Sequence, residues 1–201
     1  MDISNDFNRS QYTKFAEQYL LLNQDTEIGG WNAEWRAEIV KQFLPKGRLI
    51  FEIGAGGGDD AVALRSAWYE VIPTDFVQPF VEELVAKGFP AFVFDAKEDA
   101  FPVKKVDAIY ANAVFVHFSP KEIHDFLVKA QQYLDNEKLI FISVLLGSWT
   151  TRAGRNRGFD RDFQYYYYVT LKNILDDAGY DTIWSKEIDK KWIQIVAKVR
   201  E

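Results

Sequence analysis

The chain has 201 residues, of which 48% are apolar and 27% charged, and this balance excludes a disordered or low-complexity protein. Its 24 Lys and Arg residues stand against 30 Asp and Glu residues, and the net charge of -6 disfavours general binding to nucleic acids or anionic membranes. Because the sequence has no cysteine, disulfides, thiolate zinc sites and cysteine nucleophiles are excluded. The polar start is unlike a signal peptide and no apolar run reaches membrane-spanning length, so we expect a cytoplasmic protein without a membrane anchor.

Strand-like and helix-like segments alternate along the chain. Apolar residues spaced by three and four predict a first helix over 8–22, and a second over 31–44 stops before Pro45. Ser119 and Glu122 form a capping box that starts a later helix. The further helices are expected at 59–68, 77–87, 120–134 and 170–178. The strands are expected at 48–53, 70–74, 91–94, 106–111, 139–146, 180–188 and 192–199.

This alternation predicts the fold class. Strands separated by helices imply a mostly parallel sheet with right-handed crossovers and helices on both faces. The last two strands are separated only by residues 189–191, which suits an antiparallel hairpin. We therefore expect a single doubly wound α/β domain that ends in a hairpin. The one long stretch without a clear period, 147–168, is expected to be an irregular loop.

A glycine cluster lies between the first expected strand and the helix that follows it. Four of the 12 glycines fall within residues 54–58. Glycine there allows positive φ and the close approach of a ligand, and the helix N-terminus behind it can bind an anion. Asp59 and Asp60 stand where a P-loop needs its Lys, and a dinucleotide fingerprint needs Gly or Ala at position 59. Both of those nucleotide motifs are therefore disfavoured.

The same segment resembles the first motif of a known family. Glu52, Gly54, Gly56 and Gly58 match the pattern acid-x-Gly-x-Gly-x-Gly of the class I S-adenosylmethionine-dependent methyltransferases. The resemblance extends over about residues 10–200 and implies a Rossmann-like, seven-stranded, mostly parallel sheet with S-adenosyl-L-methionine as cofactor. It divides the chain into an N-terminal helical cap (1–46), a cofactor-binding core (47–146), a substrate lid (147–168) and a C-terminal helix and hairpin (169–201).

The resemblance also implies roles for individual residues. Asp75 would hold the ribose hydroxyls, Phe76 would flank the adenine, and Asp95 would accept a hydrogen bond from the adenine amino group. Asp75 and Asp95 could instead cap the helix or turn that follows each of them. The other residues implied to bind the cofactor are Glu52, Gly54, Ala55, Gly56, Gly58, Ala96, Ala111, Asn112 and Tyr19.

His117 is the candidate catalytic residue. Methyl transfer from a sulfonium depends mainly on positioning, and a base is needed only if the nucleophile arrives protonated. His117 would lie near the active face, although a packed or solvent-facing role would equally place a histidine before Ser119. His124 falls inside a helix and is expected at the surface. Two histidines without a carboxylate partner predict no metal site.

The segment 147–168 is the candidate acceptor region. Its run Arg-x-Phe-x-Tyr-Tyr resembles a group of small methyltransferases, which makes Arg161 and Tyr165 the candidate substrate contacts for an anionic or aromatic acceptor. A solvated loop whose aromatic residues pack on the sheet edge is the alternative. Trp31 and Trp35, four residues apart, are expected in the core. The arginines of this segment are Arg152, Arg155, Arg157 and Arg161.

The sequence departs from related motifs in two places. Residues 111–114, Ala-Asn-Ala-Val, lack the Asp/Asn-Pro-Pro-Tyr signature of amino-group DNA and glutamine methyltransferases, and this disfavours those substrates. Residues 135–137 replace a usual Pro-Gly-Gly turn, which should affect the turn alone. The leading hypothesis is methyl transfer to a small-molecule acceptor. The alternatives are a nicotinamide-dependent oxidoreductase, a non-catalytic cofactor-binding module, and an RNA-directed methyltransferase that uses the arginine-rich segment.

Overall fold

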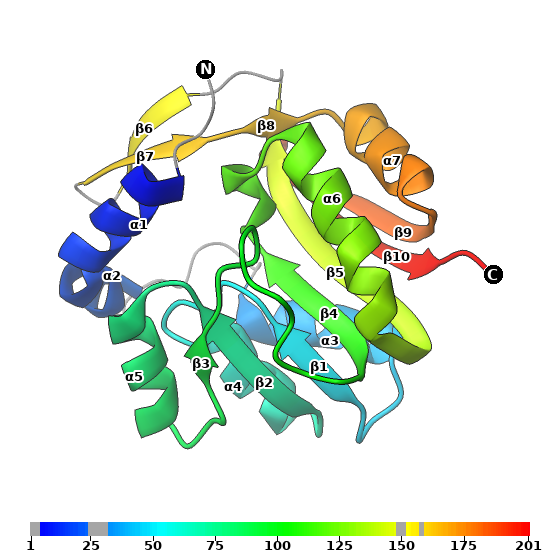
Figure 1. Ribbon diagram of the computed structural model, residues 1–201, viewed down its shortest axis with the longest axis horizontal. Coiled ribbons are helices and arrows are strands. Elements are labelled where there is room, and N and C mark those ends of the chain that lie inside the picture. Colours follow the sequence, from blue (N-terminus) through cyan, green and yellow to red (C-terminus); the bar gives the residue numbers. More distant parts are fainter. Residues whose placement is uncertain (1–4, 24–31, 148–151, 157–158) are drawn as a thin grey trace.

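An eight-stranded sheet forms the centre of the computed structural model (Figure 1). The structure describes residues 5–23, 32–147, 152–156 (backbone only) and 159–201. The strand order is β3-β2-β1-β4-β5-β10-β9, and β8 pairs with the end of β5. β1 to β5 and β8 run parallel, whereas β10 is antiparallel to both β5 and β9. The strands are β1 (Leu49–Glu52), β2 (Glu70–Asp75), β3 (Phe92–Val93), β4 (Val106–Asn112), β5 (Leu134–Leu146), β8 (Tyr165–Tyr166), β9 (Tyr180–Ile188) and β10 (Trp192–Val199).

Helices cover both faces of this sheet. α3 and α4 lie behind it and α6 and α7 in front, and each pair closes its own apolar core against the strands (Figure 1). A third, smaller cluster joins α1, α2 and α5 beside the strand ends. The doubly wound α/β fold with a C-terminal hairpin is thereby confirmed. The helices are α1 (Asn5–Lys14), α2 (Ala16–Asn23), α3 (Ala33–Phe43), α4 (Asp59–Ser66), α5 (Gln78–Ala86), α6 (Pro120–Ala130) and α7 (Tyr168–Asp177), with 3-10 turns η1 (Phe115–His117) and η2 (Gln131–Tyr133).

Local capping explains where two of the helices begin. The Ser119 hydroxyl accepts a hydrogen bond from the Glu122 backbone N–H at 3.3 Å, and the Glu122 carboxylate accepts one from the Ser119 backbone N–H at 2.6 Å. This is the capping box expected at the start of α6. Asn32 caps α3 in the same way, because its side chain accepts a hydrogen bond from the Trp35 backbone N–H at 2.9 Å.

Two helix boundaries differ from the sequence expectation. The segment 8–22 forms two helices, α1 and α2, which are separated at Phe15. The helix capped by Ser119 ends at Ala130 rather than at 134, because the chain tightens into the 3-10 turn η2 (Gln131–Tyr133) before β5 begins at Leu134. Trp35 is partly buried against the core of α3 and α4, as expected, whereas Trp31 lies outside the described residues.

The turn expected at 135–137 is part of β5 instead. The pairing of β5 with β4 shifts register between Val106 and Ala108, and Asn136 and Lys138 adopt positive φ there. The Asn136 side chain donates a hydrogen bond to Asp107 at 2.7 Å. Asp107 lies on β4, so this hydrogen bond ties the irregular start of β5 to the neighbouring strand. The segment therefore forms a bulge within the sheet rather than a separate turn.

The expectation that 147–168 is an irregular loop is wrong. β6 (Arg152–Asn156) and β7 (Phe159–Phe163) form an antiparallel ribbon, and β8 follows it. Phe159 and Arg161 point inward with alternate spacing and are 1% and 4% exposed. One of these two inward residues is charged, so the apolar alternation by which a strand is recognised is absent from the sequence.

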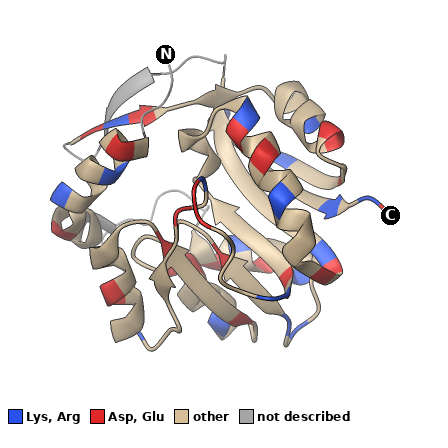
Figure 2. Cartoon of the chain, in the orientation of Figure 1, with Lys and Arg blue, Asp and Glu red and all other residues tan. Residues whose placement is uncertain are grey.

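Charges are spread over the outside of the fold. Figure 2 shows Lys and Arg interspersed with Asp and Glu along α6 and α7. In the part of the chain that the structure describes, no helix is long and apolar enough to cross a membrane. Within the same residues, no group of three or more His, Asp or Glu side chains is arranged to hold a metal ion.

Candidate cofactor and acceptor site

A cavity of about 420 Å³ lies at the carboxyl ends of the parallel strands. Its walls come from the loop after β1, the ends of β2, β3 and β4, the helices α1 and α2, and strand β7. Ligands of open α/β sheets bind at this edge, where the strand order reverses between β1 and β4. The predicted site residues that line the cavity are Tyr19, Gly54, Gly56, Asp75, Phe76, Asp95, Ala96, Asn112, His117, Arg161 and Tyr165. Those that lie outside its lining are Glu52, Ala55, Gly58 and Ala111.

The three glycines of the motif have different physical roles. All three adopt positive φ, at 63° for Gly54, 54° for Gly56 and 86° for Gly58. A Cβ on Gly54 would lie 2.5 Å from Val114 Cγ2, and one on Gly58 would lie 2.6 Å from Leu84 Cδ2, so packing requires glycine at both positions. A Cβ on Gly56 would meet only Tyr19, at an ordinary 3.5 Å. Gly56 is therefore the position at which an added side chain would meet no clash and enter the cavity, while its positive φ would still strain the backbone.

Asp75 connects the glycine loop to the turn that precedes α5. Its Oδ1 accepts a hydrogen bond from the Val77 backbone N–H at 3.0 Å and so holds the turn before α5, whose N-cap residue is Val77 and has no side-chain cap. Its Oδ2 accepts one from the Gly56 backbone N–H at 2.9 Å and ties β2 to the glycine loop. Burial raises the pKa of Asp75 to about 6, although the backbone donors oppose this shift. Its ionisation therefore changes just below neutral pH.

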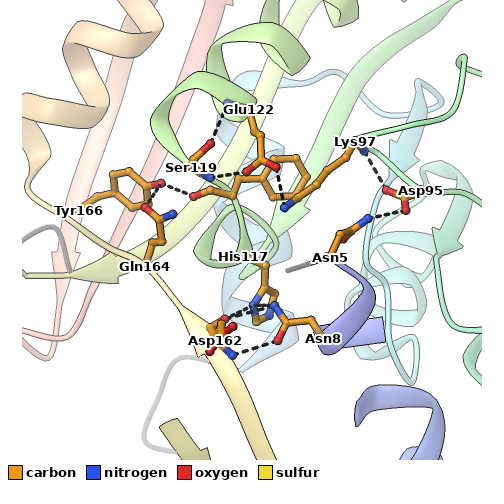
Figure 3. Close-up of polar contacts among 11 residues, drawn as sticks. Asn5, Asn8, Asp95, Lys97, His117, Ser119, Glu122, Asp162, Gln164 and Tyr166 are labelled. Carbon is orange, nitrogen blue, oxygen red and sulfur yellow. Dashed lines mark hydrogen bonds and ion pairs between the residues drawn. The ribbon is translucent and has the colours of Figure 1, made fainter. Parts of the chain in front are cut away.

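Asp95 also has two sets of partners, one local and one distant. Its Oδ1 accepts a hydrogen bond from the Lys97 backbone N–H at 3.0 Å, which is the expected cap. Its Oδ2 accepts hydrogen bonds from Asn5 at 2.7 Å and Arg9 at 2.5 Å (Figure 3 shows Asn5 and Asp95). The Arg9 guanidinium also lies 5.4 Å from the centre of the Phe76 ring. Helix α1 is thus fastened over the adenine side of the predicted cofactor site.

Glu52 belongs to a buried polar cluster behind the glycine loop. It is 2% exposed, and burial together with the nearby Asp60 carboxylate raises the pKa of Glu52 well above its usual range. Asp60 in turn accepts hydrogen bonds from Arg36 at 2.6 Å and from Asn112 at 2.9 Å. Because Asn112 lines the cavity, this cluster connects the floor of the cavity to α3 and α4.

His117 is held at both ring nitrogens, and Figure 3 shows the contacts on the side of Asp162 and Asn8. Its Nδ1 lies 2.7 Å from the Asp162 carbonyl oxygen, and its Nε2 lies 3.1 Å from the Tyr12 hydroxyl. Burial, followed by the positive charges of Arg161 and Lys97, lowers the pKa of His117 to about 4. His117 is therefore neutral at neutral pH, and its Nε2 is already engaged by the Tyr12 hydroxyl.

Two residues of α1 complete this side of the cavity, and sequence reasoning missed their role. Arg161 Nη1 donates a hydrogen bond to the Tyr12 hydroxyl at 2.8 Å. The Asn8 side chain accepts a hydrogen bond from the Asp162 backbone N–H at 3.0 Å and is 1% exposed. Tyr12 was visible only as one member of an apolar helical stripe, and Asn8 carried no signal at all, because their partners lie on β7.

The fold and the site together define a class of protein. A mostly parallel sheet with a final antiparallel hairpin, a glycine loop after β1 and an acid at the end of β2 are the features of a class I S-adenosylmethionine-dependent methyltransferase. The residues fit such a cofactor, because Gly56 leaves the cavity open beside the Asp75 carboxylate. A family model described as a methyltransferase domain matches residues 30–185, and the chain belongs to that family.

Solved structures with the same fold include enzymes of this class. An S-adenosylmethionine-dependent methyltransferase from Methanosarcina mazei is 16% identical, with 81% of this chain and 98% of that chain covered at a TM-score of 0.70. The 1,6-didemethyltoxoflavin-N1-methyltransferase of Burkholderia thailandensis, with 1,6-didemethyltoxoflavin and S-adenosylhomocysteine bound, is 16% identical, with 96% of this chain and 87% of that chain covered at a TM-score of 0.75. The magnesium protoporphyrin IX methyltransferase of Synechocystis, with bound S-adenosylhomocysteine, is 15% identical, with 98% of this chain and 99% of that chain covered at a TM-score of 0.72. No curated protein matches the chain.

Proposed function

We propose that this enzyme transfers the methyl group of S-adenosylmethionine to a small-molecule acceptor. The observation that carries the proposal is one cavity that joins the glycine loop and Asp75 to an aromatic wall formed by α1 and β7. The Burkholderia neighbour, which has a small heteroaromatic compound bound, supports an acceptor of this size. The acidic, cysteine-free composition supports a cytoplasmic location, and we propose that residues 147–168 act as a substrate lid.

The cofactor roles follow from the geometry of the chain. The backbone of Gly54 and Gly56 would hold the methionine part, with Tyr19 packed against the loop. Asp75 would accept hydrogen bonds from the ribose hydroxyls, since each carboxylate oxygen has lone-pair capacity beyond its backbone donor. Phe76 and Asp95 would contact the adenine. Glu52, Ala55, Gly58 and Ala111 would shape the loop and the floor from behind the lining.

Catalysis by this site rests on positioning. When bound, the cofactor supplies a methyl carbon that its sulfonium already activates, so the protein has to align the acceptor and exclude water. The half-buried ring of Phe163 and the buried rings of Phe118 and Tyr12 exclude water from the β7 side. His117 is neutral there, and its contribution to the acceptor passes through the Tyr12 hydroxyl.

The test is a calorimetric titration with S-adenosylhomocysteine, with NADH run beside it. We expect micromolar binding of S-adenosylhomocysteine alone. Gly56→Val should abolish that binding, because its side chain enters the cavity, whereas Gly88→Val is a matched control. Gly88 has a similar positive φ of 77°, a Cβ added there would have no atom within 4 Å, and the residue does not line the cavity.

Each outcome of this titration decides between functions. Equal affinity of wild type and Gly56→Val for S-adenosylhomocysteine would contradict the cofactor site. Binding of NADH instead would favour the oxidoreductase. Binding of S-adenosylhomocysteine without methyl transfer to any acceptor of a broad panel would favour the non-catalytic module.

A further inference from the structure

One polar side chain interrupts a buried apolar run of β5. Residues 139–146 are apolar except at Ser143, which is 1% exposed. A buried hydroxyl needs hydrogen-bond partners, because leaving it unpaired costs free energy. Ser143 lies outside the cavity lining, but it pairs in the sheet with Asn112, the last residue of β4, which lines the cavity. Its hydrogen-bond partners therefore lie at the floor of the cavity.

The Ser143 hydroxyl holds the turn after β4 at two points. Its oxygen accepts a hydrogen bond from the Ala113 backbone N–H at 2.9 Å. Its proton is donated to Asn112 Oδ1 at 2.5 Å. The orientation of the Asn112 amide follows from the Asp60 carboxylate, which accepts a hydrogen bond from Nδ2 at 2.9 Å and so leaves Oδ1 to face Ser143. The hydroxyl is thus used as a donor and as an acceptor within the protein.

The turn that Ser143 holds has a strained backbone conformation. Ala113 adopts a φ of 58°, in the left-handed region that disfavours a residue with a Cβ atom. The hydrogen bond from the Ala113 N–H to Ser143 is made in this conformation and offsets part of its cost. Without the hydroxyl, we expect the chain to relax towards an ordinary negative φ at Ala113.

Val114 connects this turn to both sides of the cavity. A Cβ on Gly54 would lie 2.5 Å from Val114 Cγ2, so the valine packs directly against the glycine loop. The Val114 carbonyl oxygen accepts a hydrogen bond from the His117 backbone N–H at 3.0 Å, within the 3-10 turn η1. Gly54, Val114 and His117 all line the cavity. A change of φ at Ala113 would therefore displace the glycine loop and His117 together.

We propose that Ser143 is a positioning residue, whose hydroxyl fixes the turn at 112–114 and so aligns the glycine loop with the cavity wall around His117. This inference rests on the proposed methyl transfer, in which the protein acts by aligning the cofactor with the acceptor. Ser143 would contact neither ligand, since it lies outside the cavity lining. Its effect on both passes through Ala113 and Val114.

The first measurement follows the protein without ligand by NMR. In Ser143→Ala we expect the backbone amide signal of Gly54 and the ring nitrogen signals of His117 to shift together, because both depend on the same turn. Tyr180→Phe is the matched control. Tyr180 is fully buried, and its hydroxyl likewise bonds the backbone, at the Leu127 carbonyl 3.0 Å away and outside the cavity lining. Its loss should leave both sets of signals in place.

The second measurement is the affinity for S-adenosylhomocysteine. Ser143→Ala should weaken it by about tenfold, the effect of one buried hydrogen bond. Ala113→Gly alone should change it little, because glycine adopts positive φ without strain. In the double variant, most of the affinity lost in Ser143→Ala should return, since glycine keeps the turn without help from the hydroxyl. A serine that only filled space would not be rescued by a change at position 113.

A milder variant covers the case in which Ser143→Ala does not fold. Ser143→Cys keeps the approximate size of the side chain and a weak acceptor, so its loss of affinity should be smaller than that of Ser143→Ala. The same recovery is expected when Ala113→Gly is added to it.

Three results would overturn the positioning role of Ser143. These are equal losses of affinity in the wild-type and Ala113→Gly backgrounds, unshifted signals of Gly54 and His117 in Ser143→Ala, or the same shifts in Tyr180→Phe. Failure of the wild type to bind S-adenosylhomocysteine would instead contradict the proposed methyl transfer. The NMR comparison needs no ligand, so it would still decide whether Ser143 sets the turn.

Discussion

The two sides of the cavity are built in different ways. On the proposed cofactor side, the key contact joins the Gly56 backbone to Asp75, which are 19 residues apart at the ends of adjacent parallel strands. On the proposed acceptor side, Tyr12 meets His117 and Arg161 across separations of 105 and 149 residues. The first side depends on backbone geometry and the second on side chains that two distant elements bring together. A short motif can therefore identify the cofactor side, whereas no contiguous pattern marks the acceptor side.

The largest expected effect is on the cofactor side. Asp75→Asn should weaken S-adenosylhomocysteine binding by about 100-fold, because a charged acceptor of the ribose hydroxyls becomes a neutral group that also donates. Asp107→Asn is the matched control, since Asp107 is likewise buried and accepts a backbone N–H, from Leu49 at 2.9 Å, outside the cavity lining. Calorimetry measures both variants, and equal losses of affinity would contradict a specific role for Asp75.

The next effect separates stability from binding on the acceptor side. Asn8→Ala should lower the free energy of unfolding by about 1–2 kcal/mol, because the partly buried Asp162 backbone N–H loses its acceptor. Urea denaturation measures this loss, and S-adenosylhomocysteine affinity should change little. Ser10→Ala, at an exposed position of the same helix, should leave the unfolding free energy nearly unchanged. A similar loss in both variants would mean that Asn8 does not anchor α1 to β7.

A pH titration sharpens the comparison further. Asp75 has its pKa raised to about 6, so its carboxylate gains a proton as the pH falls through that value. S-adenosylhomocysteine affinity should therefore decrease by about tenfold between pH 7 and pH 5. His117, with its pKa near 4, stays neutral over this range and should not contribute. In Asp75→Asn the affinity for S-adenosylhomocysteine should no longer depend on pH over this range. A pH dependence that persists in this variant would show that another group titrates.

The smallest effect is expected where α1 meets the adenine side. Arg9→Met removes the ion pair with Asp95, but the Arg9 side chain is 41% exposed and the Asn5 bond to Asp95 remains. The loss of unfolding free energy should therefore stay below about 1 kcal/mol and shrink as salt is added. Thermal unfolding at low and high salt measures this, and a large loss independent of salt would show that Arg9 acts through packing on Phe76 instead.

The sequence by itself determined the order of the elements and the position of the glycine loop beside Asp75. Alternating apolar runs and helical periods are local properties, so the doubly wound sheet and the C-terminal hairpin could be predicted from them. Gly54, Gly56 and Asp75 could be placed because strand ends of a parallel sheet meet at one edge. The capping box at Ser119 was likewise readable, since both partners lie within three residues of each other.

Only the tertiary structure decided the acceptor side. The sequence does not predict the β6–β7 ribbon, because an inward position of β7 is taken by the charged Arg161, which is buried against Tyr12 and the Phe163 ring. Tyr12 and Asn8 gained their roles from contacts with residues more than 100 positions away. Such contacts exist only after the sheet has brought α1 beside β7, because side-chain hydrogen bonds over that separation leave no trace in local composition or period.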